Sequence, residues 1–301
     1  MFRPILFKTG GFVASMNKKK TIGLLLLLPL TIWLVVFALY PILYGLRLSL
    51  YNARINNIDN PTFIGLQNYI KLFSNSEFGQ SLLWSLKFAV ICTLIQMTLG
   101  VLISWLFQRD FPGKGLATTL ILLPMVVAPF LMGTMFRLLF NESVGPIAYL
   151  LSGLTGTTAL LGIAWVNPTI IGADTINRMP FVFINIYSAM QGVPQELLEQ
   201  ATVDGANAFQ KLIHVTLPSI SAIFGITFLE KLLQSFLIFE LIFAMTAGGP
   251  GTFTQSVSIF IYRRAFQRSD YGMACAASFA LALILLVPSL YLVRRNTKGD
   301  K

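Results

Sequence analysis

Six apolar runs constrain this chain more than any other feature of its 301 residues. They cover residues 21–43, 82–107, 116–140, 169–190, 222–245 and 271–293. A helix crosses the hydrocarbon core of a bilayer with about 20 mostly apolar residues, so each run is long enough to span it. The composition agrees, because 55% of the residues are hydrophobic and only 11% are charged, against about 25% charged in soluble domains. We therefore expect an all-α membrane protein with six transmembrane helices.

The positive charge lies beside these runs. Three consecutive lysines, residues 18–20, precede the first run, and Arg294 and Arg295 follow the last. With both ends inside, the inner segments carry 12 of the 22 Lys and Arg and the outer segments carry 6. Cytoplasmic flanks carry this excess, so we expect both termini to be cytoplasmic. The domain organisation expected is a basic tail over 1–20, a transmembrane domain over 21–295 and a short tail over 296–301, with no nucleic-acid partner.

The segment EQATVDGANAFQKLIHVTLP, residues 199–218, is polar and interrupts this apolar chain. It belongs to the longest inner loop, residues 191–221. Pro194 suits the start of a short helix that runs to Ala201. Asp204 suits the cap of a second helix, from Ala206 to His214, with Gly205 at the turn between them. The loop is therefore expected to be a compact pair of helices.

The same segment resembles the permease subunits of bacterial ABC importers. Their loop has Glu-Ala-Ala, three residues, Gly, nine residues and Ile-x-Leu-Pro, and the matching positions are Glu199, Gln200, Ala201, Gly205, Val215, Leu217 and Pro218. Gln200 and Val215 are mild departures. FIGLQNY (63–69) and TAGGP (246–250) resemble the branch with the maltose and glycerol-phosphate permeases, with Ala247 in place of a usual glycine.

The resemblance implies the type I ABC importer permease fold in a bacterial cytoplasmic membrane. Residues 191–221 would couple to an ATPase through Glu199, Gln200, Ala201, Asp204, Gly205, Leu217 and Pro218. The implied partners are a second permease, two ATPase subunits that carry ATP and magnesium, an extracytoplasmic solute-binding protein and an oligosaccharide. The alternative for the loop is a plain connection between spans.

No phosphate-binding loop of the form G-x-x-x-x-G-K-[ST] occurs in the sequence, so energy must come from another chain or from an ion gradient. Cys92 and Cys275 lie inside apolar runs without a histidine or second thiol at ligand spacing, so we expect no metal site. The only histidine, His214, lies in the polar loop. An enzyme is therefore not expected.

Polar residues inside the fourth and fifth runs mark a candidate solute path. Thr227, Glu230, Lys231, Gln234 and Ser235 fall on one helical face, which must point at protein or water rather than lipid. The candidate path residues are Arg178, Asn185, Tyr187, Glu230, Lys231 and Gln234. For the charges, ion pairing between helices, including Asp174 with Arg178, is an equally open interpretation.

The nature of the solute stays open at this level. Arg178 and Lys231 would suit an acidic oligosaccharide such as a uronate of the alginate type, whereas Asp174 and Glu230 would neutralise them. Neutral oligosaccharides and glycerol phosphates therefore also remain open. The alternative function is a stand-alone secondary transporter that uses Asp174, Glu230 and Glu240 as ion sites, although the two halves of the sequence show no internal repeat.

Overall fold

The computed structural model describes residues 26–298, with side chains described to residue 286. The predicted tail 1–20 lies outside the described residues, and the segment 296–298 continues the last helix. In chain order the helices are η1 (Val35–Leu39), α2 (Tyr40–Ser49), η2 (Ile55–Asn57), α3 (Gln67–Phe73), α4 (Ser76–Leu106), α5 (Lys114–Val126), α6 (Pro129–Leu139), α7 (Pro146–Thr155), α8 (Val166–Gln191), α9 (Gln195–Val203), α10 (Ala208–Lys211), η3 (Leu212–Thr216), α11 (Leu217–Ser219), α12 (Ser221–Phe236), α13 (Glu240–Thr246), α14 (Val257–Tyr262), η4 (Arg263–Gln267) and α15 (Tyr271–Lys298).

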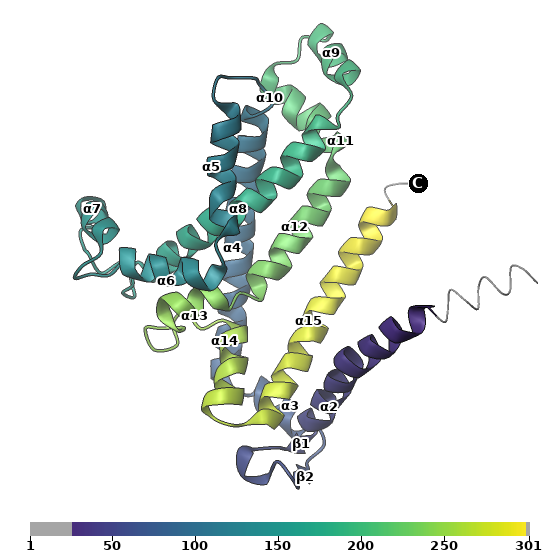
Figure 1. Ribbon diagram of the computed structural model, residues 1–301, viewed down its shortest axis with the longest axis vertical. Helices are drawn as coiled ribbons and strands as arrows, with labels where there is room; N and C mark the ends of the chain where they lie inside the picture. Colours follow the sequence, from purple (N-terminus) through teal and green to yellow (C-terminus); the bar gives the residue numbers. More distant parts are fainter. Residues whose placement is uncertain (1–25, 299–301) are drawn as a thin grey trace, which may run out of the picture.

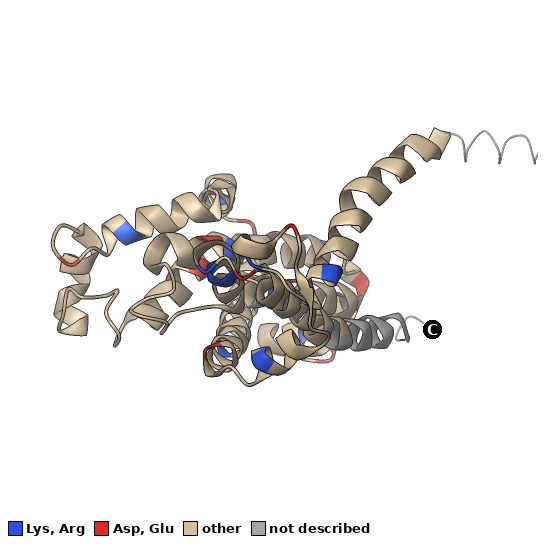
Figure 2. Cartoon of the chain, turned by 90° about the horizontal axis from the view of Figure 1, so that it is seen from below, with Lys and Arg blue, Asp and Glu red and all other residues tan. Residues whose placement is uncertain are grey.

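The fold is helical, as expected, with one small addition. Strands β1 (Tyr51–Asn52) and β2 (Thr62–Phe63) pair antiparallel in a two-stranded hairpin. Figure 1 places this hairpin at one end of the bundle and α9 at the other, with α4 running along most of the distance, α15 rising from the hairpin end, and α8 and α12 in the half nearer α9. Charged residues are sparse among the tan residues of the bundle seen end-on in Figure 2. The predicted helical class is therefore confirmed, with this small hairpin as an addition.

Three helices of the described part are both long enough and apolar enough to cross a membrane, namely Leu26–Ser49, Ser76–Leu106 and Ser221–Thr246. A fourth span results if the bent pair Lys114–Val126 and Pro129–Leu139 is counted as one. Helix α8 has 26 residues, enough to cross a bilayer of ordinary thickness, but it is not among them. Its polar residues Asp174, Thr175 and Asn177 are buried inside the protein.

The third predicted span is not one helix. Helices α5 and α6 meet at 97° across Val127 and Ala128. Pro129 has no N–H to continue α5, and it disfavours helical backbone in Ala128, which is extended at φ −56° and ψ 136°. Asn177 of α8 donates from Nδ2 to the carbonyl oxygens of Pro124 and Val127 at 2.9 and 3.2 Å. The prediction of a continuous helix over 116–140 is therefore wrong, and Pro129 explains the break.

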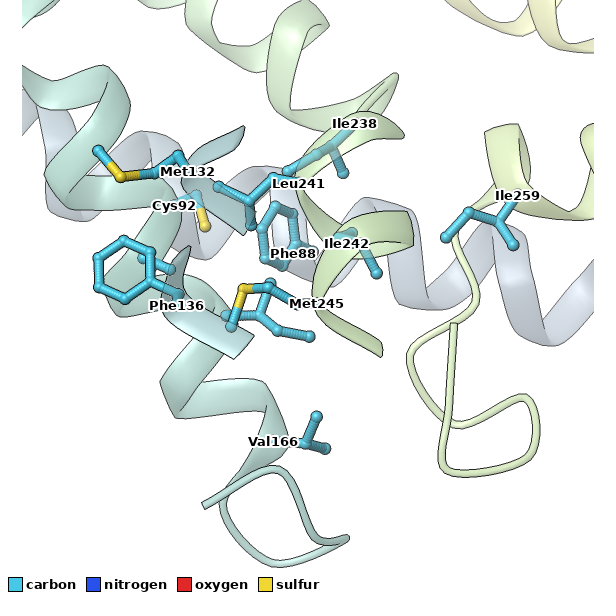
Figure 3. Close-up of a cluster of buried hydrophobic side chains, with 12 residues drawn as sticks. Phe88, Cys92, Met132, Phe136, Val166, Ile238, Leu241, Ile242, Met245 and Ile259 are labelled. Atoms are coloured by element: carbon cyan, nitrogen blue, oxygen red, sulfur yellow. The ribbon is translucent and has the colours of Figure 1, made fainter. Parts of the chain in front are cut away.

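Helix α6 crosses the bundle and packs on α13. The two helices approach so closely that a Cβ on Gly133 would lie 2.6 Å from the carbonyl oxygen of Leu241. Around this contact lies the largest apolar cluster, shown in Figure 3, where Phe88 of α4, Met132 of α6, Val166 of α8 and Met245 of α13 converge. The core thus joins α6, the second half of the broken third span, to α13, the last part of the predicted fifth span.

The motif FIGLQNY shapes the hairpin end. Asn68 is buried and donates from Nδ2 to the carbonyl oxygens of Ser49 and Tyr51 at 2.8 and 2.9 Å. The Tyr69 hydroxyl lies 2.8 Å from Ser49 Oγ. These contacts fasten α3 to the end of the first helix, so the motif has a structural role in this chain.

Candidate functional site

The polar loop 191–221 folds into the expected pair of short helices. Helix α9 follows Pro194 and ends at Asp204, whose backbone N–H donates to Gln200 O at 3.0 Å. Gly205 then adopts φ +80°, and the N–H of Ala206 reaches back to Ala201 O at 2.9 Å. This is a Schellman ending, which requires a residue in the left-handed region and therefore favours glycine.

The second helix begins later than predicted. Asn207, not Asp204, is its N-cap, and Asn207 and Gln210 exchange two side-chain-to-backbone hydrogen bonds of 2.9 Å. Asp204 is instead the C-cap of α9. The helix α10 then continues through η3 into α11, past the predicted end at His214. The assignment of Asp204 as the second cap is therefore wrong, because the Schellman ending uses the residues between the two helices.

Most of the predicted coupling residues lie on the outside of the loop. Glu199, Gln200, Asp204, Gly205 and Pro218 are exposed. Ala201 is half-buried, and Leu217 packs against the apolar cluster that anchors the loop to α4 and α8. The exposed apolar side chains Val203 and Phe209, at 88% and 56% exposure, lie on the same two helices. Apolar side chains held out on a polar loop are typical of a surface that meets a partner.

A cavity of about 450 Å³ separates α9 from the ends of α4 and α8. Its lining mixes charged and aromatic side chains, among them Trp105, Arg109, Glu199 and Lys211. Lys211 Nζ donates to Thr202 Oγ1 at 2.6 Å and so ties the second helix to α9. This hydrogen bond holds the two short helices of the loop together.

Charged and polar residues in the middle of the bundle form a second site. We call it the buried charge cluster, and its members are Gln96, Asp174, Arg178 and Lys231. Asp174 is fully buried; its Oδ1 lies 2.9 Å from Arg178 Nε, and its Oδ2 accepts from Gln96 Nε2 at 2.8 Å. Lys231, also fully buried, interacts electrostatically with Asp174 and Arg178. One carboxylate thus faces two cations contributed by α8 and α12. The ion-pairing interpretation holds for Asp174 and Arg178.

The predicted polar face of α12 divides into a buried and an exposed part. Lys231 Nζ lies 6.0 Å from the Phe181 ring centroid and 3.5 Å from Gln234 Oε1. Gln234 is half-buried and donates from Nε2 to Glu230 Oε1 at 3.1 Å. Glu230 is exposed. An exposed carboxylate in the middle of a membrane helix must face water or another polypeptide, because lipid would leave its charge unsolvated.

Two other predicted path residues lie further along α8. Asn185 is half-buried. Tyr187 stacks on Phe183 with 5.5 Å between ring centroids, and Lys114 Nζ of α5 lies 5.8 Å from the Tyr187 ring. Tyr187 therefore contacts the N-terminal end of α5. Their roles in a solute path stay predictions.

Two residues with central places in the structure were not among the predicted site residues. Gln96 is buried and joins α4 to Asp174, and Asn177 is buried and joins α8 to the break of the third span. Both are uncharged amides in apolar runs. A polar residue within a membrane helix is the available signal, since it needs an internal partner, but the sequence does not reveal which partner.

The fold and the two sites define a membrane-embedded transport permease, and comparison with known proteins gives its family. Residues 96–295 match the family model described as "Binding-protein-dependent transport system inner membrane component", and the chain belongs to this family. This family depends on a binding protein, unlike the stand-alone secondary transporter considered as an alternative.

Relatives extend over most of the chain. It is 27% identical to the trehalose/maltose transport system permease MalF of Thermococcus litoralis, covering 89% of this chain and 91% of the relative. It is 31% identical to a probable ABC transporter permease, y4oQ, of Sinorhizobium fredii, covering 79% and 77%. The sn-glycerol-3-phosphate permease UgpA of Agrobacterium fabrum is 25% identical, covering 91% and 94%. The resemblance to the maltose and glycerol-phosphate branch is thereby confirmed.

The fold also has a solved counterpart. A chain in the crystal structure of a bacterial ABC transporter for the import of alginate, an acidic polysaccharide, superposes with a TM-score of 0.83 at 22% identity. The match covers 96% of this chain and 99% of that chain. The predicted permease fold is therefore confirmed, whereas the number of spans and the side of each terminus stay predictions.

Proposed function

We propose that this chain is one half of the translocation path of an ATP-driven importer for an oligosaccharide in a bacterial cytoplasmic membrane. The observation that carries the proposal is the exposed coupling loop, whose motif residues lie on its outer side while its apolar residues fasten it to α4 and α8. The sugar class is supported by sequence relatives that carry trehalose and maltose in their names.

The mechanism needs no covalent chemistry from this chain. A solute-binding protein delivers the sugar at the hairpin end, and two ATPase subunits bind the coupling loops of this chain and a second permease. When the ATPases close on ATP, the two coupling loops move towards each other. The solute path between the two permeases then changes the side of the membrane on which it opens. Because α8 leads into α9 after only three residues, 192–194, displacement of the loop is transmitted to α8.

The charge of the solute depends on which side chains face the path. An acidic uronate oligosaccharide is favoured by Arg178 and Lys231, but Lys231 is enclosed by its own chain and Asp174 pairs with Arg178. The exposed charge on α12 is Glu230, which repels carboxylates. We therefore place a neutral oligosaccharide first and an acidic one second.

The test is ATP hydrolysis by the reconstituted complex, assembled with the partner subunits encoded beside this chain. Binding proteins loaded with neutral or acidic oligosaccharides are added in turn. Stimulation by the neutral class is expected, and Glu230→Gln is expected to admit acidic sugars by removing the repulsion. Lys231→Met is the matched control, because it removes an enclosed charge from the adjacent position.

Selective loss of acidic sugars in Lys231→Met would instead establish the acidic class. A complex that binds no ATPase, or whose hydrolysis ignores every loaded binding protein, would contradict the importer itself.

A further inference from the structure

The break between α5 and α6 leaves carbonyl groups without helical partners in the middle of the predicted third span. Helix α5 ends at Val126, the Val127 N–H closes a last turn on Pro124 O at 3.3 Å, and Pro129 has no N–H with which to continue the helix. Within a bilayer such groups need a partner from the protein, since lipid supplies none. In this chain the Asn177 side chain donates to Pro124 O, which also accepts from the Val127 N–H at 3.3 Å, and to Val127 O.

Asn177 is suited to this role by chemistry as well as position. Its side chain is buried, with 4% of the residue exposed, and its Nδ2 donates to both carbonyl oxygens. A backbone carbonyl only accepts, so the amide nitrogen, not the oxygen, must point at the break. No other hydrogen bond of a described side chain to these two carbonyls is seen.

The place of Asn177 on α8 links the break to the rest of the molecule. It lies one residue before Arg178, whose partner Asp174 reaches α4 through Gln96. Helix α8 runs without interruption from there to Gln191, and the coupling helix α9 begins at Gln195. On the other side of the break, α6 packs on α13. The side chain of Asn177 therefore joins two parts of the molecule. One is α8, which leads to the coupling loop, and the other is the bend between α5 and α6, which positions α6 against α13.

We propose that Asn177 is a positioning residue that fixes the bend of the third span to α8, and through α8 to the coupling loop. When α8 moves, the break then moves with it and the angle between α5 and α6 changes. Helix α8 does not slide past the break. The link to the coupling loop rests on the proposed transport function, whereas the fixed bend itself does not.

Asn167 offers a matched control on the same helix. Its Oδ1 accepts from Trp84 Nε1 at 3.0 Å, and an indole N–H only donates. Asn→Asp keeps an acceptor at position 167 but removes the donor at position 177. The same substitution is therefore expected to be tolerated at one position and harmful at the other.

The first experiment measures the bend in the full chain, in lipid nanodiscs, by electron spin resonance distances. Spin labels replace Leu120 of α5 and Leu138 of α6, both exposed, and Cys92 and Cys275 are exchanged for alanine. In Asn177→Asp the distance is expected to broaden and shift at about pH 9 and to return towards wild type at about pH 5, where the neutral acid again donates. Asn167→Asp is expected to match wild type at both pH values.

Asn177→Ala is the second variant, which removes both hydrogen bonds without adding a charge. It is expected to shift the distance equally at both pH values. A wild-type distance in both Asn177 variants would overturn the proposal, and so would a shift in Asn177→Asp that acid does not reverse.

The second experiment measures stimulated ATP hydrolysis in the assembled importer. Asn177→Asp is expected to lower it about tenfold at high pH and to recover with acid, because the hydrogen bond is restored. A shifted bend with unchanged stimulation would overturn the link to the coupling loop. If wild type itself is not stimulated by any loaded binding protein, the proposed function fails while the distances still decide the role of Asn177.

Discussion

The coupling loop and the buried charge cluster both place polar residues in an apolar chain, but they use them in opposite ways. In the loop, Glu199 and Asp204 are exposed, and neither side chain forms an ion pair among the described residues. In the cluster, Asp174 is buried, accepts a hydrogen bond from Gln96 and forms an ion pair with Arg178. The loop leaves its polar groups exposed, whereas the cluster pairs Asp174 with Arg178 inside the protein and leaves Gln96 Oε1 without a hydrogen-bond partner among the described residues. Polarity alone therefore does not identify a solute path.

The largest effect is expected where the cluster loses its only carboxylate. Asp174→Asn leaves the half-buried Arg178 and the buried Lys231 without the carboxylate of the cluster, and removing one partner of a buried pair costs about 3–5 kcal/mol. Thermal unfolding of the purified chain in detergent measures the loss. Lys231→Met added to Asp174→Asn is expected to recover part of it, because one cation is then gone. Equal stability of the single and double variants would show that Lys231 is not balanced by Asp174.

A smaller effect on stability, but a specific one on coupling, is expected at the loop. Gly205→Ala places a side chain at φ +80°, with no atom within 4 Å of the new Cβ, so the cost is backbone strain of about 1 kcal/mol. Gly156, at φ +71° after α7 and equally free of neighbours, is the matched control. Both variants are expected to unfold at similarly lowered temperatures.

Only Gly205→Ala is expected to reduce the stimulation of ATP hydrolysis, since the Schellman ending orients α9 towards its partner. Loss of stimulation in both variants would attribute the effect to stability and not to the loop.

The smallest effect is expected at the turn after α13. Ala247 occupies φ +51°, the left-handed region that favours glycine. Ala247→Gly relieves this strain and is expected to stabilise the chain by about 0.5–1 kcal/mol, measured by thermal unfolding. Ala117→Gly, inside α5, is expected to have the opposite sign, because glycine weakens a helix interior. A destabilised Ala247→Gly would show that the alanine methyl contributes packing at the turn.

The sequence by itself determined the membrane class, the helical fold and the position of the polar loop 191–221. These features depend on local patterns, namely apolar runs of spanning length and a motif whose glycine is needed by its own backbone conformation. Pro129 also carried the information for the break in the third span, because proline cannot continue a helix, although hydropathy alone suggested one helix.

Only the tertiary structure decided which polar residues meet. Glu230 and Lys231 are neighbours in sequence, yet one is exposed and the other is enclosed, because adjacent residues of a helix point about 100° apart. Gln96 and Asp174 are 78 residues apart and share a hydrogen bond. Asn177 meets carbonyls about 50 residues away. Such contacts depend on how three helices pack side by side, and no periodicity within one helix specifies the neighbour it will have.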